Sequence, residues 1–278
     1  MSLAITSLNS GSNGNCYYIG NDKEAVLIDA GISCRETEKR MRLLGLSMNK
    51  VKAIFISHEH SDHIKAIPVL AEKYDLPVHI TKSTLQRGGI KLKNQLIRNF
   101  TAYEPVLIGG LSVTAFPKYH DAIDPHSFLI SFNGINVGVF TDIGASCEHV
   151  IKHFGYCHAA FLETNYDETL LETGRYPAHL KNRIRGGSGH LSNTQALEIF
   201  KKHRPSFMTH LLLSHLSKDN NRPEMVKKLF DEHAGGINII VASRYESTAV
   251  YTIQQPQVPG MKSVIPVPSI RMKQMSLF

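Results

Sequence analysis

The chain has 278 residues, of which 42% are hydrophobic, and a formal net charge of +7. This length suits one domain or one domain with a tail, and the absence of an apolar run of about 18 residues argues against a membrane span. The basic balance favours polyanionic partners. The first residues lack a signal-peptide pattern and the four cysteines show no CxxC spacing, so we expect a cytoplasmic protein with reduced thiols and no membrane contact.

Short apolar runs alternate with amphipathic segments along the chain, and turn residues separate them. In chain order, the predicted elements are strands at 3–8, 16–20 and 25–29, a helix at 35–44, a strand at 51–57, a helix at 62–74, a strand at 77–81, mostly strands over 105–140, a helix at 147–154, a strand at 159–163, a helix at 193–202, a strand at 207–214, a helix at 223–232, and strands at 238–241 and 248–252. Ser192 or Asn193 is the expected N-cap of the helix at 193–202.

The composition changes after these elements. Residues 254–278 contain four prolines and little periodicity, which is typical of an extended or disordered segment rather than of a core. The sequence therefore predicts a folded hydrolase domain over 1–253 and a flexible, proline-containing tail over 254–278.

A dense run of metal-ligand residue types follows the predicted strand at 51–57. It has the pattern HxHxDH and is formed by His58, His60, Asp62 and His63. Neutral imidazoles and carboxylates are natural ligands of zinc, iron and manganese. Because the pattern joins a strand end to a helix start, we expect His58 and His60 to face one ion, and Asp62 and His63 to face a second.

Four more polar residues stand where predicted strands end. They are Asp29, His120, Asp142 and His215. Ligands gather outside the carboxyl ends of strands in many sheet proteins. One such residue could be a cap or a turn, but four of them together with the HxHxDH pattern indicate a metal centre.

This constellation resembles the metallo-β-lactamase superfamily over nearly the whole predicted domain. The resemblance implies an α/β fold, the αβ/βα sandwich, in which two mixed β-sheets face each other with helices outside. It also implies two divalent metal ions per chain, and zinc, manganese and iron remain open. The ligands it implies are His58, His60 and His120 for the first ion, Asp62, His63 and His215 for the second, and Asp142 as a bridge, with Asp29 behind them to orient the loop.

Two further motifs resemble the ribonuclease Z pattern. Residues 161–165 include Glu163, and residues 189–199 include His190. In that group, a glutamate and a histidine at the matching positions form a proton-handling pair beside the metals. The predicted catalytic residues are therefore Asp62, Glu163 and His190. The alternative is that Glu163 only ends a strand and His190 only lies in a glycine-rich loop.

The motifs are closer still to the YycJ/WalJ family of single-domain bacterial nucleases. The segments that carry this likeness are 8–16, 120–125, 141–144, 162–167 and 213–220. The resemblance implies a 5′-to-3′ exonuclease that acts on DNA and is linked to mismatch repair. The interval from Asp142 to His215 is too short for the cap domain of the β-CASP processing enzymes.

Basic residues cluster in the only sizeable insertion expected near the site, at 173–187. We predict that Arg175, Lys181, Arg183 and Arg185 contact phosphates, which would make binding depend on salt; the alternative is a solvated basic surface. The loop at 9–15 has two open interpretations, an approach to the site and a simple hairpin turn.

The last five residues resemble the pentapeptide that binds the bacterial sliding clamp. Gln274, Leu277 and Phe278 match its pattern, whereas Met275 replaces the more usual leucine. A tethered apolar anchor pair suits binding in a groove. The sequence therefore predicts a sliding clamp as a possible partner, and an inert tail is the alternative.

The leading prediction of function is a metal-dependent DNA exonuclease in repair. An RNA nuclease is the second prediction, because no motif in the sequence distinguishes the sugar of RNA from that of DNA. A hydrolase of small esters, thioesters or cyclic phosphodiesters shares the metal core, but the basic insertion and the Glu163–His190 pair argue against it. A non-catalytic binding module would require a broken ligand set.

Overall fold

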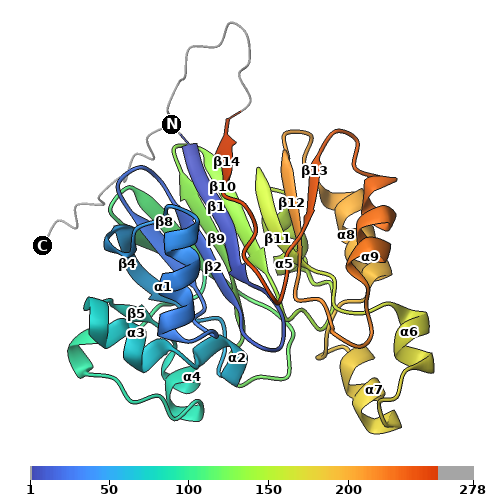
Figure 1. The fold of residues 1–278 in the computed structure, drawn as a ribbon, viewed down its shortest axis with the longest axis horizontal. Helices are drawn as coiled ribbons and strands as arrows, with labels where there is room; N and C mark the ends of the chain where they lie inside the picture. Colours follow the sequence, from blue (N-terminus) through green and yellow to red (C-terminus); the bar gives the residue numbers. More distant parts are fainter. Residues whose placement is uncertain (1, 256–278) are drawn as a thin grey trace, which may run out of the picture.

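Two mixed β-sheets face each other at the centre of the molecule (Figure 1). The computed structural model describes residues 2–255. The first sheet has seven strands in the order β14-β1-β2-β3-β4-β5-β6, which span Ser2–Asn9 (β1), Cys16–Gly20 (β2), Ala25–Ile28 (β3), Val51–Phe55 (β4), Val78–His79 (β5), Ile97–Arg98 (β6) and Tyr251–Gln254 (β14). The second has seven in the order β13-β12-β11-β10-β9-β8-β7, which span Pro105–Ile108 (β7), Leu111–Pro117 (β8), His126–Phe132 (β9), Ile135–Phe140 (β10), Ala159–Glu163 (β11), His210–Ser214 (β12) and Asn238–Val241 (β13).

Helices cover the outer face of each sheet (Figure 1). The first sheet is covered by α1 (Cys34–Leu43), α2 (Ser61–Ile64), α3 (Ile67–Tyr74) and α4 (Lys82–Arg87), and the second by α5 (Glu148–Phe154), α8 (Asn193–His203) and α9 (Pro223–Asp231). Two short helices, α6 (Glu168–Thr173) and α7 (Ala178–Arg185), lie beside the second sheet, and short 3-10 turns span Met48–Lys50 and Asn94–Leu96. The predicted αβ/βα sandwich is confirmed. None of the helices in residues 2–255 is long and apolar enough to cross a membrane.

The sequences of the inner strands are continuous apolar runs because their side chains alternate between two covered faces. In β3, Val26 and Ile28 belong to the apolar layer between the sheets, whereas Ala25 and Leu27 pack with the helices outside. Successive strand residues point to opposite faces, so a strand that is covered on both sides needs apolar residues at every position.

Several boundaries differ from the sequence prediction. The helix expected at 62–74 is two helices, α2 and α3, and Pro68 lies in the first turn of α3. Proline has no backbone N–H to bond the carbonyl oxygen four residues earlier, here that of Ile64, where α2 ends. Strand β12 begins at His210 rather than 207, and β14 spans Tyr251–Gln254 rather than 248–252.

Three helices were not predicted, namely α4, α6 and α7. Helix α7 has no buried residue, and such a helix leaves no apolar stripe for a periodicity argument to detect. The start of α8 was predicted correctly, because Ser192 caps it in a capping box with Gln195.

The parallel halves of the two sheets determine where polar side chains collect. Strands β3 to β6 run parallel in the first sheet, and β10 to β13 run parallel in the second. The carboxyl ends of parallel strands meet at one edge of a sheet. Asp29, Glu163 and His215 end or directly follow β3, β11 and β12, and His58 and Asp142 follow β4 and β10 within three residues.

Candidate metal centre

Three of the residues at the strand ends have left-handed backbone conformations. Asp29, Asp142 and His215 have φ values of 62°, 56° and 58°. Such values are uncommon outside glycine, and Asp and His are among the residue types that adopt them most often. Each turn directs its side chain back across the sheet edge, so the three side chains reach a common region between the sheets.

The first set of ligand atoms is a three-histidine group formed by His58, His60 and His120. The Nε2 atom of His58 lies 3.1 Å from Nδ1 of His60, and that Nδ1 lies 3.3 Å from Nε2 of His120. Ligands about 2.0 Å from a tetrahedral zinc ion lie roughly 3.3 Å apart. The spacing therefore fits three ligands of one cation.

Hydrogen bonds fix the tautomers of two of these imidazoles. Nδ1 of His120 donates to the carbonyl oxygen of Gly189 at 3.0 Å. Ser57 Oγ donates to Asp29 Oδ2, so it accepts from Nδ1 of His58 at 2.9 Å. The inner Nε2 atoms of both neutral rings then carry lone pairs that face the same point, which is the arrangement that a divalent cation stabilises.

The second set is an aspartate–histidine group formed by Asp62, His63 and His215, and the Asp142 carboxylate lies against it. Nε2 of His63 lies 3.5 Å from Asp62 Oδ2 and 3.2 Å from Asp142 Oδ2. Nε2 of His215 lies 3.6 Å from Asp62 Oδ2 and 3.5 Å from Asp142 Oδ1. Two carboxylates and two imidazoles therefore converge on one point.

Asp142 lies between the two groups. Its Oδ1 is 3.9 Å from Nε2 of His120, which belongs to the three-histidine group. Its Oδ2 and Nε2 of His215 are buried without a hydrogen-bond partner among residues 2–255. Because buried polar atoms are nearly always satisfied, these two orphaned atoms fit a centre that holds a cation.

Electrostatics distinguish the two groups. Burial lowers the pKa of His58 well below its ordinary value and that of His120 to about 4. Burial also opposes protonation of His63 and His215, but nearby carboxylates, Asp142 first, hold the pKa of His63 well above its usual range and raise that of His215 to about 10. The carboxylates at the aspartate–histidine group thus stabilise positive charge on its imidazoles, whereas burial favours the neutral forms of His58 and His120.

Glu163 contacts two imidazoles at once. Its Oε1 lies 2.7 Å from Nδ1 of His190 and 3.1 Å from Nδ1 of His215, and its Oε2 accepts from the backbone N–H of Ile143 at 2.6 Å. Burial raises the pKa of Glu163, but the neighbouring His190 outweighs burial and lowers it to about 2. The sequence suggested the Glu163–His190 pair but not the contact with His215, a predicted metal ligand.

Asp29 lies behind the HxHxDH loop, as the sequence suggested. It is fully buried, its Oδ2 lies 2.7 Å from Nδ1 of His63, and its Oδ1 accepts from the backbone N–H of Ser57. A carboxylate that accepts from the outer nitrogen of an imidazole fixes the ring and raises the basicity of the inner nitrogen.

The loop at 9–15 approaches the site, and its two functional contacts were not predicted. Ser10 Oγ accepts from the backbone N–H of His215 at 2.7 Å. Asn15 Oδ1 accepts from the backbone N–H of Gly11 at 3.0 Å, so its Nδ2 faces Asp62 Oδ2 at 3.1 Å. The polar composition of the loop was the available signal, but it suits a simple hairpin turn equally well.

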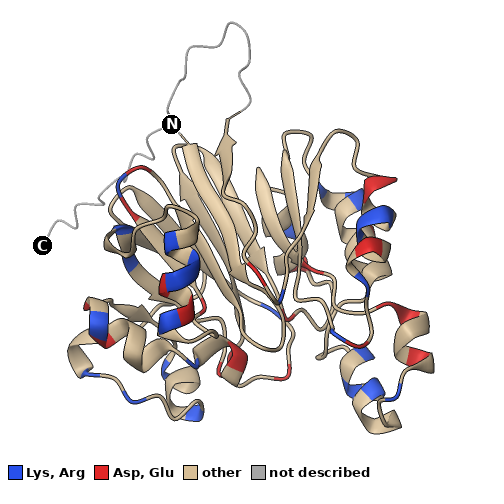
Figure 2. Ribbon diagram, in the orientation of Figure 1, with Lys and Arg blue, Asp and Glu red and all other residues tan. Residues whose placement is uncertain are grey.

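The basic insertion forms α7, the end of α6 and the turns around them, and Figure 2 shows basic positions on α7 and acidic positions on the neighbouring α6. Arg185 pairs with Glu172 at 2.9 Å, and Lys181 donates to the Glu172 carbonyl oxygen. Arg183 pairs with Asp121, the neighbour of His120. Arg183 therefore attaches the insertion to the loop that carries His120. Contact of these side chains and of Arg175 with phosphates remains a prediction.

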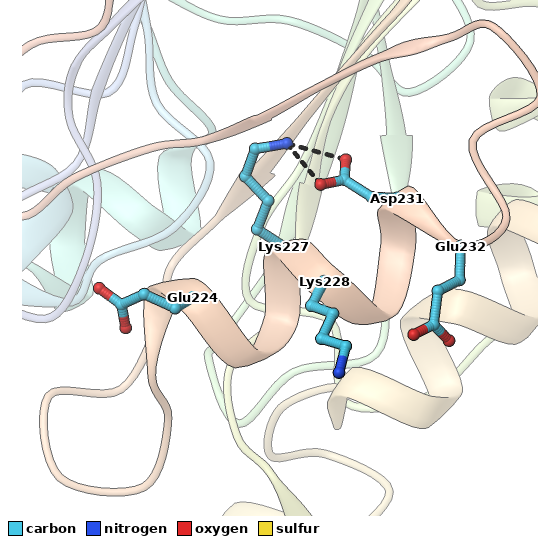
Figure 3. A pocket seen from close by; sticks show the side chains of 5 residues that line it. All are labelled: Glu224, Lys227, Lys228, Asp231 and Glu232. Atoms are coloured by element: carbon cyan, nitrogen blue, oxygen red, sulfur yellow. Dashed lines mark hydrogen bonds and ion pairs between the residues drawn. The ribbon is translucent and has the colours of Figure 1, made fainter.

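A surface hollow lies along α9, away from the metal ligands, and is lined by Glu224, Lys227, Lys228, Asp231 and Glu232. Figure 3 shows four of these side chains on α9 and Glu232 directly after its end, and Lys227 already pairs with Asp231 at 2.8 Å. Opposite charges four residues apart are typical of a solvated helix face. We therefore assign no chemistry to this hollow.

Comparison with known proteins identifies the family. The beta-lactamase superfamily domain matches residues 24–215. The chain belongs to the metallo-β-lactamase superfamily. Within this superfamily, exodeoxyribonuclease YycJ of Bacillus anthracis is 34% identical over 246 residues, which cover 85% of this chain and 92% of that protein. Exodeoxyribonuclease WalJ of Streptococcus pneumoniae is 29% identical over 225 residues, covering 78% and 83% of the two chains.

The fold comparison agrees with membership of the metallo-β-lactamase superfamily. The crystal structure of YhfI from Bacillus subtilis, a metallo-beta-lactamase fold protein, aligns with a TM-score of 0.69 at 16% identity and covers 91% of this chain and 100% of its own. The predicted resemblance to YycJ and WalJ is confirmed. The ligand clusters of this superfamily member indicate binding of divalent metal. The clamp-binding prediction for Gln274, Leu277 and Phe278 lies outside the described residues.

Proposed function

We propose that this chain is a metal-dependent phosphodiesterase, a 5′-to-3′ exonuclease that acts on DNA in repair. Two relatives that align over most of the chain are named exodeoxyribonucleases. The observation that carries the proposal is the joining of two ligand groups by the buried carboxylate of Asp142, with the Glu163–His190 pair at the same edge. Groups of this kind suit two divalent cations that act on one phosphate.

His58, His60 and His120 would hold one cation, Asp62, His63 and His215 would hold the second, and Asp142 would contact both. Bound divalent cations supply Lewis acidity toward a phosphoryl oxygen and make water easier to deprotonate. The metal can be zinc, manganese or iron, because imidazole and carboxylate ligands accept all three.

His190 is the proton donor in this proposal. Its Nδ1 donates to Glu163, which leaves Nε2 as the atom that exchanges a proton, and its side chain is 18% exposed whereas that of Glu163 is fully buried. Glu163 orients the ring, so Nε2 can protonate the leaving oxygen of the strand. Glu163 also holds His215, and thereby links proton donation to the aspartate–histidine group.

Exposed apolar side chains on the loop that carries His120 favour a nucleic-acid substrate over a small molecule. Tyr119 precedes His120 and is 60% exposed, and Ile123 on the same loop is 56% exposed. The backbone N–H of Ile123 donates to Glu59 at 2.9 Å, so this loop is attached to the HxHxDH segment. An exposed ring next to a hydrolytic centre suits stacking of an unpaired base.

The test is a nuclease assay with the purified wild-type protein and the Asp62→Ala variant. The substrates are 5′-phosphorylated duplex DNA, single-stranded DNA and RNA, with manganese or zinc added, and with chelator. We expect DNA to shorten from its 5′ end only with metal, and Asp62→Ala to lose this activity. Degradation of RNA alone would assign the RNA-nuclease alternative, and turnover of only a small ester or phosphodiester would overturn the substrate assignment.

Clamp binding by the tail is a separate prediction. Deletion of residues 274–278 should abolish binding to a bacterial sliding clamp and spare nuclease activity, because the pentapeptide carries the anchor side chains. Unchanged clamp affinity after the deletion would contradict it. Surface plasmon resonance with immobilised clamp measures the affinity.

A further inference from the structure

Arg244, in the loop after β13, has a guanidinium group without an acidic partner. No carboxylate among residues 2–255 forms an ion pair with it, and its buried Nη1 has no hydrogen-bond partner. Its Nη2 donates to Ser12 Oγ at 3.2 Å. A buried N–H without an acceptor is unfavourable, so an anion that accepted from Nη1 would stabilise this arginine.

Arg40, a neighbour of Arg244, shows the contrast. Its Nε pairs with Glu36 at 2.8 Å, its Nη1 donates to the Leu8 carbonyl oxygen at 2.6 Å, and its Nη2 donates to the Tyr245 carbonyl oxygen at 2.8 Å. Arg40 is thus satisfied by the fold and holds the loop on which Arg244 lies. The unmet hydrogen-bonding capacity in this region belongs to Arg244.

The backbone around Arg244 is fixed to the tip of the loop at 9–15. Asn13 Nδ2 donates to the Arg244 carbonyl oxygen at 2.8 Å, and Ser10 N–H donates to the Ser243 carbonyl oxygen at 3.1 Å. Ser12 and Asn13 are exposed, and their backbone N–H groups have no acceptor within residues 2–255. A guanidinium, a hydroxyl and two free backbone N–H groups therefore lie on two loops that are joined to each other.

This cluster of donors adjoins the metal ligands. Ser10, two residues before Ser12, holds the backbone of His215, and a Cβ added at Gly11 would lie 3.3 Å from Cβ of Arg244 and 3.6 Å from the Leu216 carbonyl oxygen. The nearby Asp219 carboxylate already accepts from the Tyr176 hydroxyl at 2.9 Å. The donors are therefore next to His215, and no acidic side chain among residues 2–255 forms an ion pair with Arg244.

We propose that Arg244, with Ser12 and the tip of its loop, binds a phosphate of the substrate strand next to the phosphate that is cleaved. The inference rests on the proposed nuclease function and deepens it. Guanidinium groups bind phosphate with paired, charge-assisted hydrogen bonds. The phosphate is either the terminal 5′-phosphate of the strand or an internal one, and both offer the same oxygens.

The experiment measures binding of single-stranded DNA by fluorescence anisotropy over a series of salt concentrations. The metal-loaded protein is titrated against oligonucleotides with nuclease-resistant phosphorothioate linkages, labelled at the 3′ end, with either a 5′-phosphate or a 5′-hydroxyl. The variants are Arg244→Gln, Arg244→Lys and Ser12→Ala. Arg42→Gln, which removes one charge from the exposed surface of α1, is the matched control.

We expect Arg244→Gln to weaken binding about tenfold and to reduce the slope of log K against log salt by about 0.7, the value for one phosphate of a single strand. Arg244→Lys should keep the slope, because it keeps the charge, and Ser12→Ala should weaken binding a few-fold. Weakening with the 5′-phosphate alone assigns the terminal phosphate, and equal weakening with both oligonucleotides assigns an internal one.

The inference would be overturned if the folded Arg244→Gln and Ser12→Ala variants both bound DNA with the same affinity as Arg42→Gln. If the wild-type protein still cleaved DNA in the assay above, the nuclease proposal would remain intact. A wild-type protein that neither binds nor cleaves DNA would instead overturn the proposed function.

Discussion

The two halves of the metal centre differ in what holds their imidazoles. In the three-histidine group, the outer nitrogens of His58 and His120 donate to neutral oxygens, those of Ser57 and Gly189. No carboxylate oxygen of Asp142 comes closer to His120 Nε2 than 3.9 Å. The group presents neutral nitrogen ligands to a cation.

In the aspartate–histidine group, buried carboxylates take the place of those neutral oxygens. His63 donates to Asp29 at 2.7 Å, and His215 donates to Glu163 at 3.1 Å. A carboxylate behind an imidazole makes the inner nitrogen a stronger ligand. This group therefore combines charged ligands with reinforced imidazoles.

The two groups would therefore hold the two proposed cations with different affinities. The aspartate–histidine group includes a carboxylate of its own, Asp62, whereas the three-histidine group includes none and has only carboxylates beside it, those of Asp121 at 3.4 Å and Asp142 at 3.9 Å from His120 Nε2. Metal affinity should therefore respond differently in the two groups when their supporting residues are changed, and the shared carboxylate should matter to both.

The largest effect should come from Asp142→Ala, which removes the carboxylate that both groups use. Loss of a residue behind a ligand typically costs 10–100-fold in metal affinity or activity, so loss of a ligand shared by two groups should lower activity by at least about 100-fold and reduce bound metal. Elemental analysis and nuclease rates measure both. Arg183→Ala is the comparison variant, since Arg183 pairs with Asp121 and not with a predicted ligand, and similar activity of the two variants would contradict the assignment.

A smaller and more selective effect is expected from Glu163→Gln. Because Glu163 contacts both His190 and His215, this change should lower activity and also weaken one class of metal sites by about 10–100-fold. His190→Ala should lower activity about 100-fold, as for loss of a general acid, yet keep its metal. Calorimetric titration with manganese measures the metal affinity of both variants. If His190→Ala lost as much metal affinity as Glu163→Gln, His190 would act on the metal as well as on the proton.

Part of this centre could be predicted from the sequence because its residues are neighbours in the chain. His58, His60, Asp62 and His63 lie within one short segment after an apolar strand. Strand periodicity then identified Asp142 as a polar residue at a strand end. Such residues converge because parallel strands in a sheet end at the same edge, so a local pattern was enough to predict a long-range arrangement.

Other features depend on contacts that leave no local pattern. Glu163 could be matched to His190 through a motif, but its bond to His215 depends on the spacing of β11 and β12. The pairing of Arg183 with Asp121 joins residues 62 positions apart, and α7 buries no side chain that could mark it as a helix. The fold class was therefore accessible, whereas the partners of single polar groups were not.

The smallest effect in this series should come from Asn15→Ala. Asn15 Nδ2 donates to Asp62 Oδ2 at 3.1 Å and lies 3.1 Å from Nε2 of His63, so it steadies the aspartate–histidine group without supplying a charge. Its loss should weaken manganese binding in that group less than about tenfold, the lower limit for a carboxylate behind a ligand, and leave the three-histidine group unchanged. Asn13→Ala, which removes an exposed amide from the same loop, is the matched control for loosening of the loop. If Asn13→Ala weakened metal binding as much as Asn15→Ala, the effect would belong to the loop as a whole, and the contact with Asp62 would have no separate role.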